Sequence, residues 1–291
     1  MGWQSSAQAV GTLRDTWSVL VGAQDRLHDV RERDNRNHDG GDAGHQWDHG
    51  LVVRHAVNYA AAVAAARSVA DAGPLVDVGA GAGGFSVWAA AALDRRLIMV
   101  DKDAGHRELA SRAFGEVEVR AGVDGLEPAP VVMVMEVIEH VERSAQAGFV
   151  REVAAAVAPG GVLVMSTPDE SGYWGGWSGY PPHIATLDAT GLRDLLREQL
   201  PGWDVEVARL NGPEFALSGL ARVGVPVANR VWGTMDARLP RVTHELSHRV
   251  NQLGKRRKAP TPPAPSDYRI DPAGTGNGTG LLARAQRPRS S

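Results

Sequence analysis

A cluster of glycines directly after a short apolar run is the feature that most constrains this chain. The apolar residues 75–78 lead into the sequence Gly79-Ala80-Gly81-Ala82-Gly83-Gly84, and a helical pattern begins at Phe85. Glycines permit a tight turn and a close approach of the backbone to a ligand. A helix that starts after such a turn directs its unpaired amide groups at that ligand. The segment therefore predicts a strand, a ligand-binding turn and a helix.

Short apolar runs alternate with helical patterns over the middle of the chain. Strands are expected at residues 75–78, 97–100, 117–120, 131–135, 162–166 and 205–210. Helices are expected at residues 53–69, 85–93, 149–158 and 190–200, with another that ends at Arg112. Alternation of this kind predicts an α/β protein with a doubly wound, Rossmann-like sheet.

Two further segments lie outside this pattern. Residues 1–50 begin with a weak helical pattern up to residue 30, whereas residues 31–50 carry almost no aliphatic side chain. Such a stretch cannot bury a face, so we expect a loop or a lid there. Residues 211–254 have a helical pattern, a proline- and glycine-rich linker follows, and one more strand is expected near residues 281–285.

The composition excludes several classes of protein. The 31 basic and 34 acidic residues give a net charge of −3, which argues against a protein held to nucleic acid or to a membrane by bulk charge. Cysteine is absent, which excludes disulfide scaffolds, thiolate zinc sites and cysteine nucleophiles. The sequence opens without a signal-peptide pattern, and its most apolar run, residues 56–72, is interrupted by polar residues. We therefore expect a cytoplasmic protein without a membrane partner.

The glycine turn is accompanied by two acidic residues. Gly79, Gly81 and Gly84 satisfy the dinucleotide pattern G-x-G-x-x-G, which is ambiguous by itself and leaves a nicotinamide-dependent oxidoreductase open. Asp101 ends the next expected strand, where a carboxylate can accept hydrogen bonds from both hydroxyls of an adenosine ribose. Asp77 lies inside the first strand. A carboxylate there suits a cationic ligand that carries an amino-acid group better than it suits a pyrophosphate.

A second group of polar residues follows the fourth expected strand. Glu136, Glu139 and His140 are spaced i, i+3 and i+4, so they would share one face if a helix begins there. Either His140 takes a proton from a substrate hydroxyl, or the two carboxylates and the imidazole bind a divalent cation. His183, after the fifth strand, would add a ligand in the second arrangement. A helix cap without a catalytic role is the structural alternative.

The glycine turn, the sequence Glu136-Val137-Ile138-Glu139-His140-Val141 and the proline-glycine segment before the fifth strand together resemble the class I S-adenosylmethionine-dependent methyltransferases. The resemblance is closest to the O-methyltransferase type of ubiquinone biosynthesis and its small-molecule relatives. It implies a methyltransferase core of residues 51–210 and 280–291, with a seven-stranded sheet whose antiparallel last strand is residues 280–286. Residues 211–279 would then be a helical insertion and linker before that strand.

The resemblance also implies S-adenosylmethionine as the cofactor. The residues that would line its site lie near the ends of the first four strands: Asp77, Gly79, Ala80, Gly81, Gly83, Phe85, Asp101, Lys102, Val123, Asp124, Met135 and Glu136. His140 and Glu139 would be catalytic. The Hen1 RNA 2′-O-methyltransferases share the E-x-x-E-H cluster and use a later histidine as a fourth metal ligand. By this likeness, Mg²⁺ or another divalent cation would bind Glu136, Glu139, His140 and His183.

These features predict methyl transfer from S-adenosylmethionine to a hydroxyl of a small molecule, such as a vicinal diol, a sugar or a catechol. The alternatives are N- or C-methylation, a nicotinamide-dependent oxidoreductase, an RNA 2′-O-methyltransferase and a non-catalytic protein with the cofactor fold. The acidic net charge argues against RNA. Aromatic residues among the glycines of residues 171–180 predict either a mobile wall for the substrate or a packed surface loop. A homodimer is left open.

Overall fold

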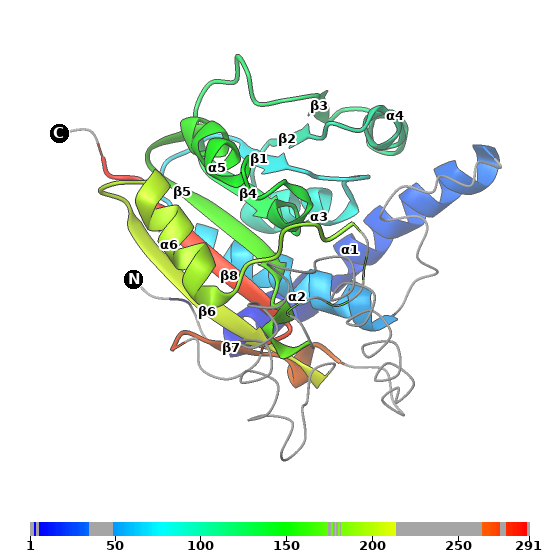
Figure 1. Ribbon diagram of the computed structural model, residues 1–291. Helices are drawn as coiled ribbons and strands as arrows, with labels where there is room; N and C mark the ends of the chain where they lie inside the picture. Colours follow the sequence, from blue (N-terminus) through cyan, green and yellow to red (C-terminus); the bar gives the residue numbers. More distant parts are fainter. Residues whose placement is uncertain are drawn as a thin grey trace.

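A mixed sheet between two layers of helices positions the residues singled out above (Figure 1). The computed structural model describes residues 3, 6–34, 49–173, 176, 178, 180, 182–213, 264–273 and 278–289. Within these residues the sheet has eight strands in the order β3-β2-β1-β4-β5-β8-β6-β7. The strands are β1 Leu75–Val78, β2 Leu97–Val100, β3 Glu118–Arg120, β4 Ala129–Met135, β5 Val157–Pro168, β6 Asp204–Asn211, β7 Arg269–Asp271 and β8 Gly280–Gln286.

The direction of the strands confirms the doubly wound sheet with an antiparallel last strand. Strands β1 to β5 are parallel where they pair, whereas β8 lies antiparallel between β5 and β6. The sheet has one strand more than expected because β7, from the expected insertion, pairs with β6, which would otherwise be the edge strand. An edge strand offers unpaired backbone groups to such a segment. Residues 214–263, which hold most of the expected insertion, lie outside the described residues.

Helices cover both faces of the sheet. They are α1 Ser6–Asp34, α2 His49–Ala66, α3 Gly84–Leu93, α4 Ala104–Ala113, α5 Gln146–Ala155 and α6 Ala189–Gln199. Along the strands the side chains alternate between the faces. Leu75 and Met133 pack in the cluster that includes α1 to α4, whereas the adjacent Val76 and Val132 pack with α5 and α6. Burial on both faces explains why these strands are continuous apolar runs.

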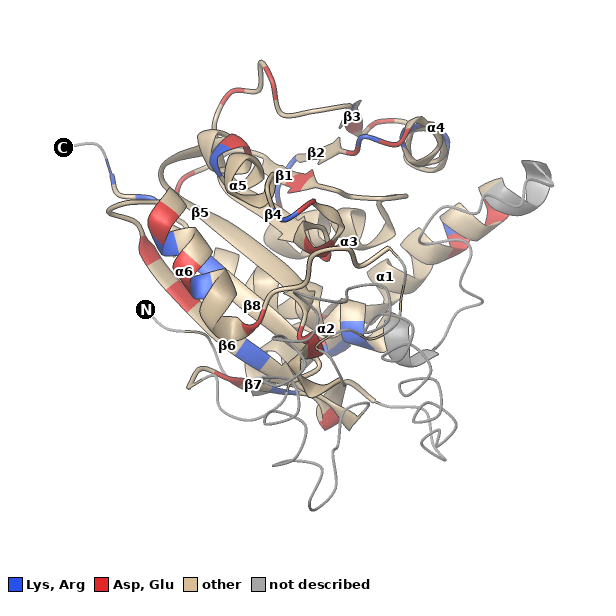
Figure 2. Cartoon of the chain, in the orientation of Figure 1, with Lys and Arg blue, Asp and Glu red and all other residues tan. Residues whose placement is uncertain are grey.

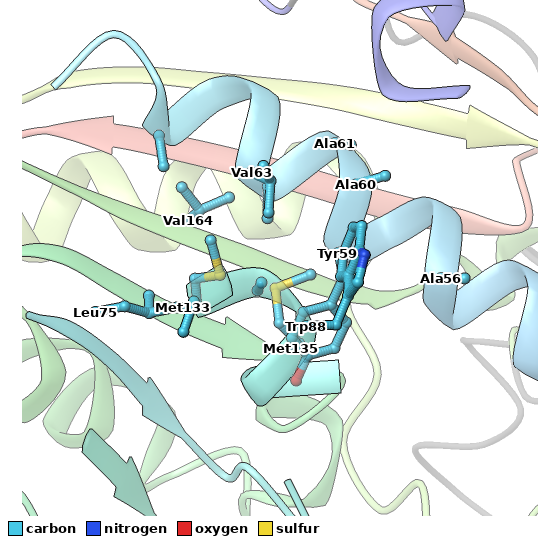
Figure 3. Close-up of a cluster of buried hydrophobic side chains, with 14 of the residues drawn as sticks. Ala56, Tyr59, Ala60, Ala61, Val63, Leu75, Trp88, Met133, Met135 and Val164 are labelled. Atoms are coloured by element: carbon cyan, nitrogen blue, oxygen red, sulfur yellow. The ribbon is translucent and has the colours of Figure 1, made fainter. Parts of the chain in front are cut away.

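The alanine-rich helix α2 lies on the sheet, and Figure 3 shows its side chains beside those of β1, β4 and β5. All of residues 56–66 are buried, because α1 packs against α2 away from the sheet. A helix that is buried all round is also apolar all round. This environment explains the apolar run of the sequence. Among the described helices, none is long and apolar enough to cross a membrane.

The N-terminal helix α1 is part of the core. Its buried residues include Leu13, Leu20, Ala23 and Leu27. Trp88 of α3 donates a hydrogen bond from Nε1 to Thr16 Oγ1 of α1 at 2.8 Å. The helix continues to Asp34, beyond the expected end at residue 30, and α2 begins at His49. Residues 35–48 lie outside the described residues, so a lid in that segment stays a prediction.

The expected boundary between the helix at residues 149–158 and the strand at residues 162–166 was wrong. Helix α5 ends at Ala155 and β5 begins at Val157, so Pro159-Gly160-Gly161 lies inside the strand. Ala129 of β4 pairs with Val157, whereas Val131 pairs with Val162, so residues 158–161 bulge out of the ladder. Gly160 has a φ of 78°, which glycine adopts without strain. These residues interrupt the register of a strand and do not end a helix.

Candidate active site

The predicted site residues follow parallel strands that end at one edge of the sheet. The glycine turn follows β1, Asp101 follows β2 and Glu136 follows β4. In open α/β sheets, ligands bind outside this carboxyl edge. Because β1 and β4 are neighbours in the sheet, the glycine turn and the segment after β4 come into direct contact.

The turn after β1 requires glycine at positions that the sequence pattern marks. Gly79, Gly81 and Gly83 have φ angles of 78°, 56° and 86°, in the left-handed region that other residues rarely adopt. A Cβ on Gly79 would lie 2.3 Å from Val137 Cγ2, and a Cβ on Gly83 would lie 2.3 Å from Met99 Sδ. The turn therefore has no room for side chains where it meets the segment after β4 and the strand β2.

Asp101 is a charged hydrogen-bond acceptor held against this turn. Its side chain is largely buried, and Oδ2 accepts a hydrogen bond from the Gly81 amide while Oδ1 accepts one from the Asp103 amide, both at 2.8 Å. His106 Nδ1 lies 3.5 Å from Oδ1. Burial disfavours the charge, but hydrogen bonds from His106 and from the two amides outweigh it and lower the pKa of Asp101. Asp101 is therefore ionised at neutral pH.

Asp77 lies in the opposite electrostatic environment. It is fully buried, and its Oδ2 accepts hydrogen bonds from Tyr59 Oη at 2.9 Å and from Ser86 Oγ at 2.7 Å. Its Oδ1 has no hydrogen-bond partner among the described residues. Burial raises the pKa of Asp77 from 3.8 to about 7. Tyr59 belongs to α2, and its ring stacks on Phe85 at 5.3 Å between centroids. This partner of Asp77 was not predicted from the sequence.

The other residues predicted for the cofactor lie along the same edge at different depths. Arg107 donates hydrogen bonds from Nη1 to the carbonyl oxygens of Asp101 and Lys102, each at 2.8 Å, and so holds the loop after β2. The remaining side chains differ in exposure: Ala80, Val123 and Met135 are buried, Phe85 is half-buried, and Lys102 and Asp124 are exposed. Their contacts with a cofactor stay predictions.

Glu136 joins β4 to helix α2 through a network of hydrogen bonds. Its carboxylate accepts hydrogen bonds from Arg54 Nη2 at 3.3 Å, from Asn58 Nδ2 at 3.2 Å and from Ser166 Oγ at 2.9 Å. Its φ of 56° is strained for a residue other than glycine. Burial disfavours the charge of Glu136, but Arg54 and His55 outweigh it and lower the pKa.

Arg54 and Asn58 were not predicted from the sequence as partners of Glu136. Both belong to helix α2, in which apolar residues otherwise dominate after residue 50. A polar side chain in a helix that is buried all round needs a partner. That interruption was the available signal, although it does not tell which strand end supplies the partner.

Glu139, His140 and His183 come together as a second group, without Glu136. The ligand atoms of these three side chains lie within 4.8 Å of one another. The residues after β4 form a 3₁₀ turn, Ile138–His140, in place of an α-helix. The shared helical face expected for Glu136, Glu139 and His140 therefore does not form. Glu136 has left-handed backbone angles and its carboxylate binds α2, whereas Glu139 and His140 face the loop after β5.

Both imidazoles in this group are oriented by an oxygen at Nδ1. His140 Nδ1 lies 2.8 Å from the carbonyl oxygen of Pro182, and His183 Nδ1 lies 2.6 Å from Glu170 Oε1. The two rings are 5.2 Å apart between centroids. Such contacts are typical of histidines whose other ring nitrogen binds a metal or takes a proton. Glu170 was not predicted from the sequence.

Glu139 completes the group from inside the protein. Its Oε2 accepts a hydrogen bond from Thr167 Oγ1 at 3.0 Å, and its Oε1 lies 3.9 Å from His140 Nε2. Oε1 has no hydrogen-bond partner among the described residues. Burial and then the charge of Glu136 raise the pKa of Glu139 well above its usual range. Burial lowers the pKa of His140, so its imidazole is neutral at pH 7.

The loop that carries His183 is fixed to the turn that carries Glu139. The amides of Ile184 and Ala185 donate to the carbonyl oxygen of Glu139 at 3.0 and 3.1 Å. Gln146 Nε2 bridges the carbonyl oxygens of Ile138 and Ala185. Residues that are distant in sequence therefore meet through backbone contacts that the sequence does not reveal.

The aromatic segment 171–180 is described only in part. The ring of Tyr180 packs edge-on against His183 at 4.7 Å between centroids. Trp174 and Trp177 lie outside the described residues, so the predicted substrate wall is not tested there.

Comparison with known proteins places this chain in a family. A family model described as a methyltransferase domain matches residues 51–206. The fold is similar to that of a SAM-dependent methyltransferase from Archaeoglobus fulgidus, with 12% identity over 82% of this chain and 94% of the other and a TM-score of 0.50. A Thermotoga maritima structure described as a SAM-dependent methyltransferase, possible histamine N-methyltransferase, is 16% identical over 81% of this chain and 91% of the other, with a TM-score of 0.47. Among curated protein sequences, none matches this chain.

Proposed function

Because this chain belongs to the methyltransferase-domain family, we propose that it transfers the methyl group of S-adenosylmethionine to a hydroxyl of a small molecule. The cofactor would lie at the glycine turn, with its ribose at Asp101 and its amino-acid end toward Asp77. An ionised acceptor at Asp101 and glycine backbone without room for side chains support this placement.

The observation that carries the choice of a hydroxyl is the group of Glu139, His140 and His183. A hydroxyl must lose its proton as it takes the methyl group, and a neutral imidazole held by its Nδ1 can accept a proton at Nε2. Glu139 and His140 of this group lie after β4, where Val137 contacts the glycine turn. In this mechanism S-adenosylmethionine would supply the methyl group to the acceptor oxygen and would leave as S-adenosylhomocysteine, while His140 Nε2 would accept the hydroxyl proton.

The same three side chains fit a divalent cation. Glu139 Oε1 is a buried oxygen without a hydrogen-bond partner among the described residues, and both histidines are oriented at Nδ1. We propose that these three residues would hold the ion, while Glu136 stays with Arg54 and does not act as the fourth ligand. Two imidazoles and one carboxylate suit Mn²⁺, Fe²⁺ or Zn²⁺ better than Mg²⁺, which prefers oxygen ligands. A bound ion would lower the pKa of the acceptor hydroxyl.

The class of substrate follows from these two roles. Metal binding at Nε2 of His140 and proton transfer to the same atom exclude each other. If the metal is used, the acceptor should present two adjacent oxygens, as a catechol or vicinal diol does. We therefore propose that this chain is an O-methyltransferase of the ubiquinone-biosynthesis type.

The distribution of charge supports a small acceptor over RNA. In Figure 2, acidic and basic segments of the described residues are interspersed along α6 and near α4. RNA recognition requires a basic surface that tracks the phosphates.

Calorimetry with S-adenosylhomocysteine and with NAD tests the cofactor. Binding of S-adenosylhomocysteine alone is expected, and binding of NAD alone would overturn the proposal. Transfer of labelled methyl groups to a catechol, a vicinal diol and a primary amine then tests the acceptor, with labelling of only the amine counting against a hydroxyl.

Chelation separates the two mechanisms. If a metal is used, EDTA and His183→Ala both suppress turnover while the affinity for S-adenosylhomocysteine is unchanged. If His140 is the base, EDTA has no effect and the rate falls as His140 becomes protonated at lower pH. Full activity after exhaustive EDTA treatment would eliminate the metal.

A further inference from the structure

Glu170 is a buried carboxylate that no sequence motif marked. It lies in the 3₁₀ turn Glu170–Gly172 after β5 and is 2% exposed. Both of its oxygens are engaged: Oε1 lies 2.6 Å from His183 Nδ1, and Oε2 accepts a hydrogen bond from the Ser178 amide at 2.8 Å. Its side chain thus joins the start of the loop after β5 to the residue that enters the site.

The turn that carries Glu170 is attached to the sheet. The preceding Asp169 is fully buried, and its carboxylate accepts a hydrogen bond from the Ser171 amide at 3.1 Å. Arg209 of β6 lies 3.2 Å from Asp169 Oδ2, and the Asp169 amide donates to the carbonyl oxygen of Thr279 beside β8. The turn that carries Glu170 is therefore attached through Asp169 to β6 and to the residue before β8.

We infer that Glu170 is a positioning residue that selects the Nδ1–H tautomer of His183, so that His183 Nε2 joins Glu139 and His140. A carboxylate without a proton can only accept, so the ring nitrogen that faces it has to donate. The lone pair of the neutral ring is then on Nε2, the atom that a metal or an acceptor hydroxyl would meet. This inference rests on the proposed function in assigning a use to Nε2.

A glutamine at position 170 would not reproduce this arrangement. Its single carbonyl oxygen can accept from His183 or from the Ser178 amide, but its amide nitrogen is a donor. A donor opposite Nδ1 favours the Nε2–H tautomer, which has no lone pair at Nε2. Glu170→Gln therefore keeps the size of the side chain and reverses its hydrogen-bonding preference. Glu170→Asp keeps the acceptor character.

Long-range ¹H–¹⁵N NMR of the histidine rings tests the inference in protein that holds no metal. We expect the Nδ1–H tautomer for His183 in the wild-type protein, a shift toward Nε2–H in Glu170→Gln, and retention of Nδ1–H in Glu170→Asp. The signal is assigned by its absence in His183→Gln. Glu198→Gln, the same change at an exposed position of α6, is the matched control and leaves the tautomer unchanged.

A titration with Mn²⁺ alone gives a second readout. Glu170→Gln should weaken Mn²⁺ binding about tenfold to a hundredfold, the usual effect of removing the partner of a ligating histidine, while the affinity for S-adenosylhomocysteine is unchanged. A wild-type protein with His183 in the Nε2–H form, or a Glu170→Gln variant with an unchanged tautomer, would overturn the inference. The NMR result decides it without any ion, so a failure of the proposed metal site is told apart from a failure of this inference.

Discussion

The proposed cofactor side and the proposed acceptor side of the site each contain two carboxylates, and in each pair one pKa is lowered and the other is raised. Asp101 and Glu136 have lowered pKa values because amides, histidines or an arginine contact them. Burial raises the pKa values of Asp77 and Glu139, and at Glu139 the charge of Glu136 adds to the rise. One oxygen of each has no hydrogen-bond partner among the described residues.

The two sides differ in how they are built. The cofactor side is one contiguous segment whose backbone angles demand glycine, together with the carboxylate at the end of the next strand. The proposed acceptor side is assembled by side chains from α2, the segment after β4, β5 and the loop after β5. A site built from the backbone of one segment can therefore be recognised from the local sequence. A site built from side chains of several elements depends on packing between segments that are distant in the chain.

Gly81→Val is expected to have the largest effect on cofactor binding. A β-branched residue is strongly disfavoured at a φ of 56°, and the Gly81 amide that donates to Asp101 would be displaced. We expect no measurable binding of S-adenosylhomocysteine in calorimetry. Gly202→Val, at a φ of 80° in open space after α6, is the control for backbone strain alone. Equal loss of binding in both variants would show that the turn has no special role.

Arg54→Met tests the network of the acceptor side. Removing one partner of a largely buried ion pair leaves the Glu136 charge uncompensated, so urea unfolding should show a loss of about 3–5 kcal/mol in the free energy of unfolding. The double variant with Glu136→Gln should regain more than half of that loss, because it carries no uncompensated charge. Arg14→Met, at an exposed ion pair, should change stability by less than about 1 kcal/mol. A single variant as stable as the wild type would mean that Arg54 does not stabilise Glu136.

The pH dependence of the unfolding free energy tests the raised pKa of Asp77. Its folded-state pKa of about 7 lies above 3.8, so its contribution to stability is complete below about pH 4 and is lost as the pH rises through 7. Asp77→Asn keeps an oxygen for Tyr59 and Ser86 but cannot ionise. From pH 5 to pH 8 the wild type should therefore lose about 3 kcal/mol of unfolding free energy relative to the variant. A difference that does not change with pH would place the pKa of Asp77 near its usual value.

Asp101→Ala should have the smallest of these effects. Loss of a charge-assisted hydrogen bond to the ribose should weaken S-adenosylhomocysteine binding by about 1.5–3 kcal/mol in calorimetry. Asp103→Ala removes an exposed helix cap two residues away and should leave the affinity unchanged. Unchanged affinity in Asp101→Ala would mean that the ribose binds elsewhere.

The local sequence determined most of the fold. The bounds of β1, β2 and β8 agree with the expected residues 75–78, 97–100 and 280–286. A strand buried on both faces is a continuous apolar run, and a turn with left-handed angles needs glycine, so both leave a pattern in neighbouring residues. The bulge in β5 was missed because a proline-glycine segment has the same local pattern whether it ends a helix or interrupts a strand.

Only the tertiary structure decided the partners and the charges of the site. The sequence marked Glu136, Glu139, His140 and His183 as one group, but packing directs Glu136 to Arg54 and Asn58 of α2 and brings Glu170 to His183. A pKa depends on burial and on charges a few ångströms away, and these neighbours come from segments far apart in the chain. The residue types of the site could therefore be predicted from the sequence, whereas the hydrogen-bond partners and the pKa of each residue depend on the fold.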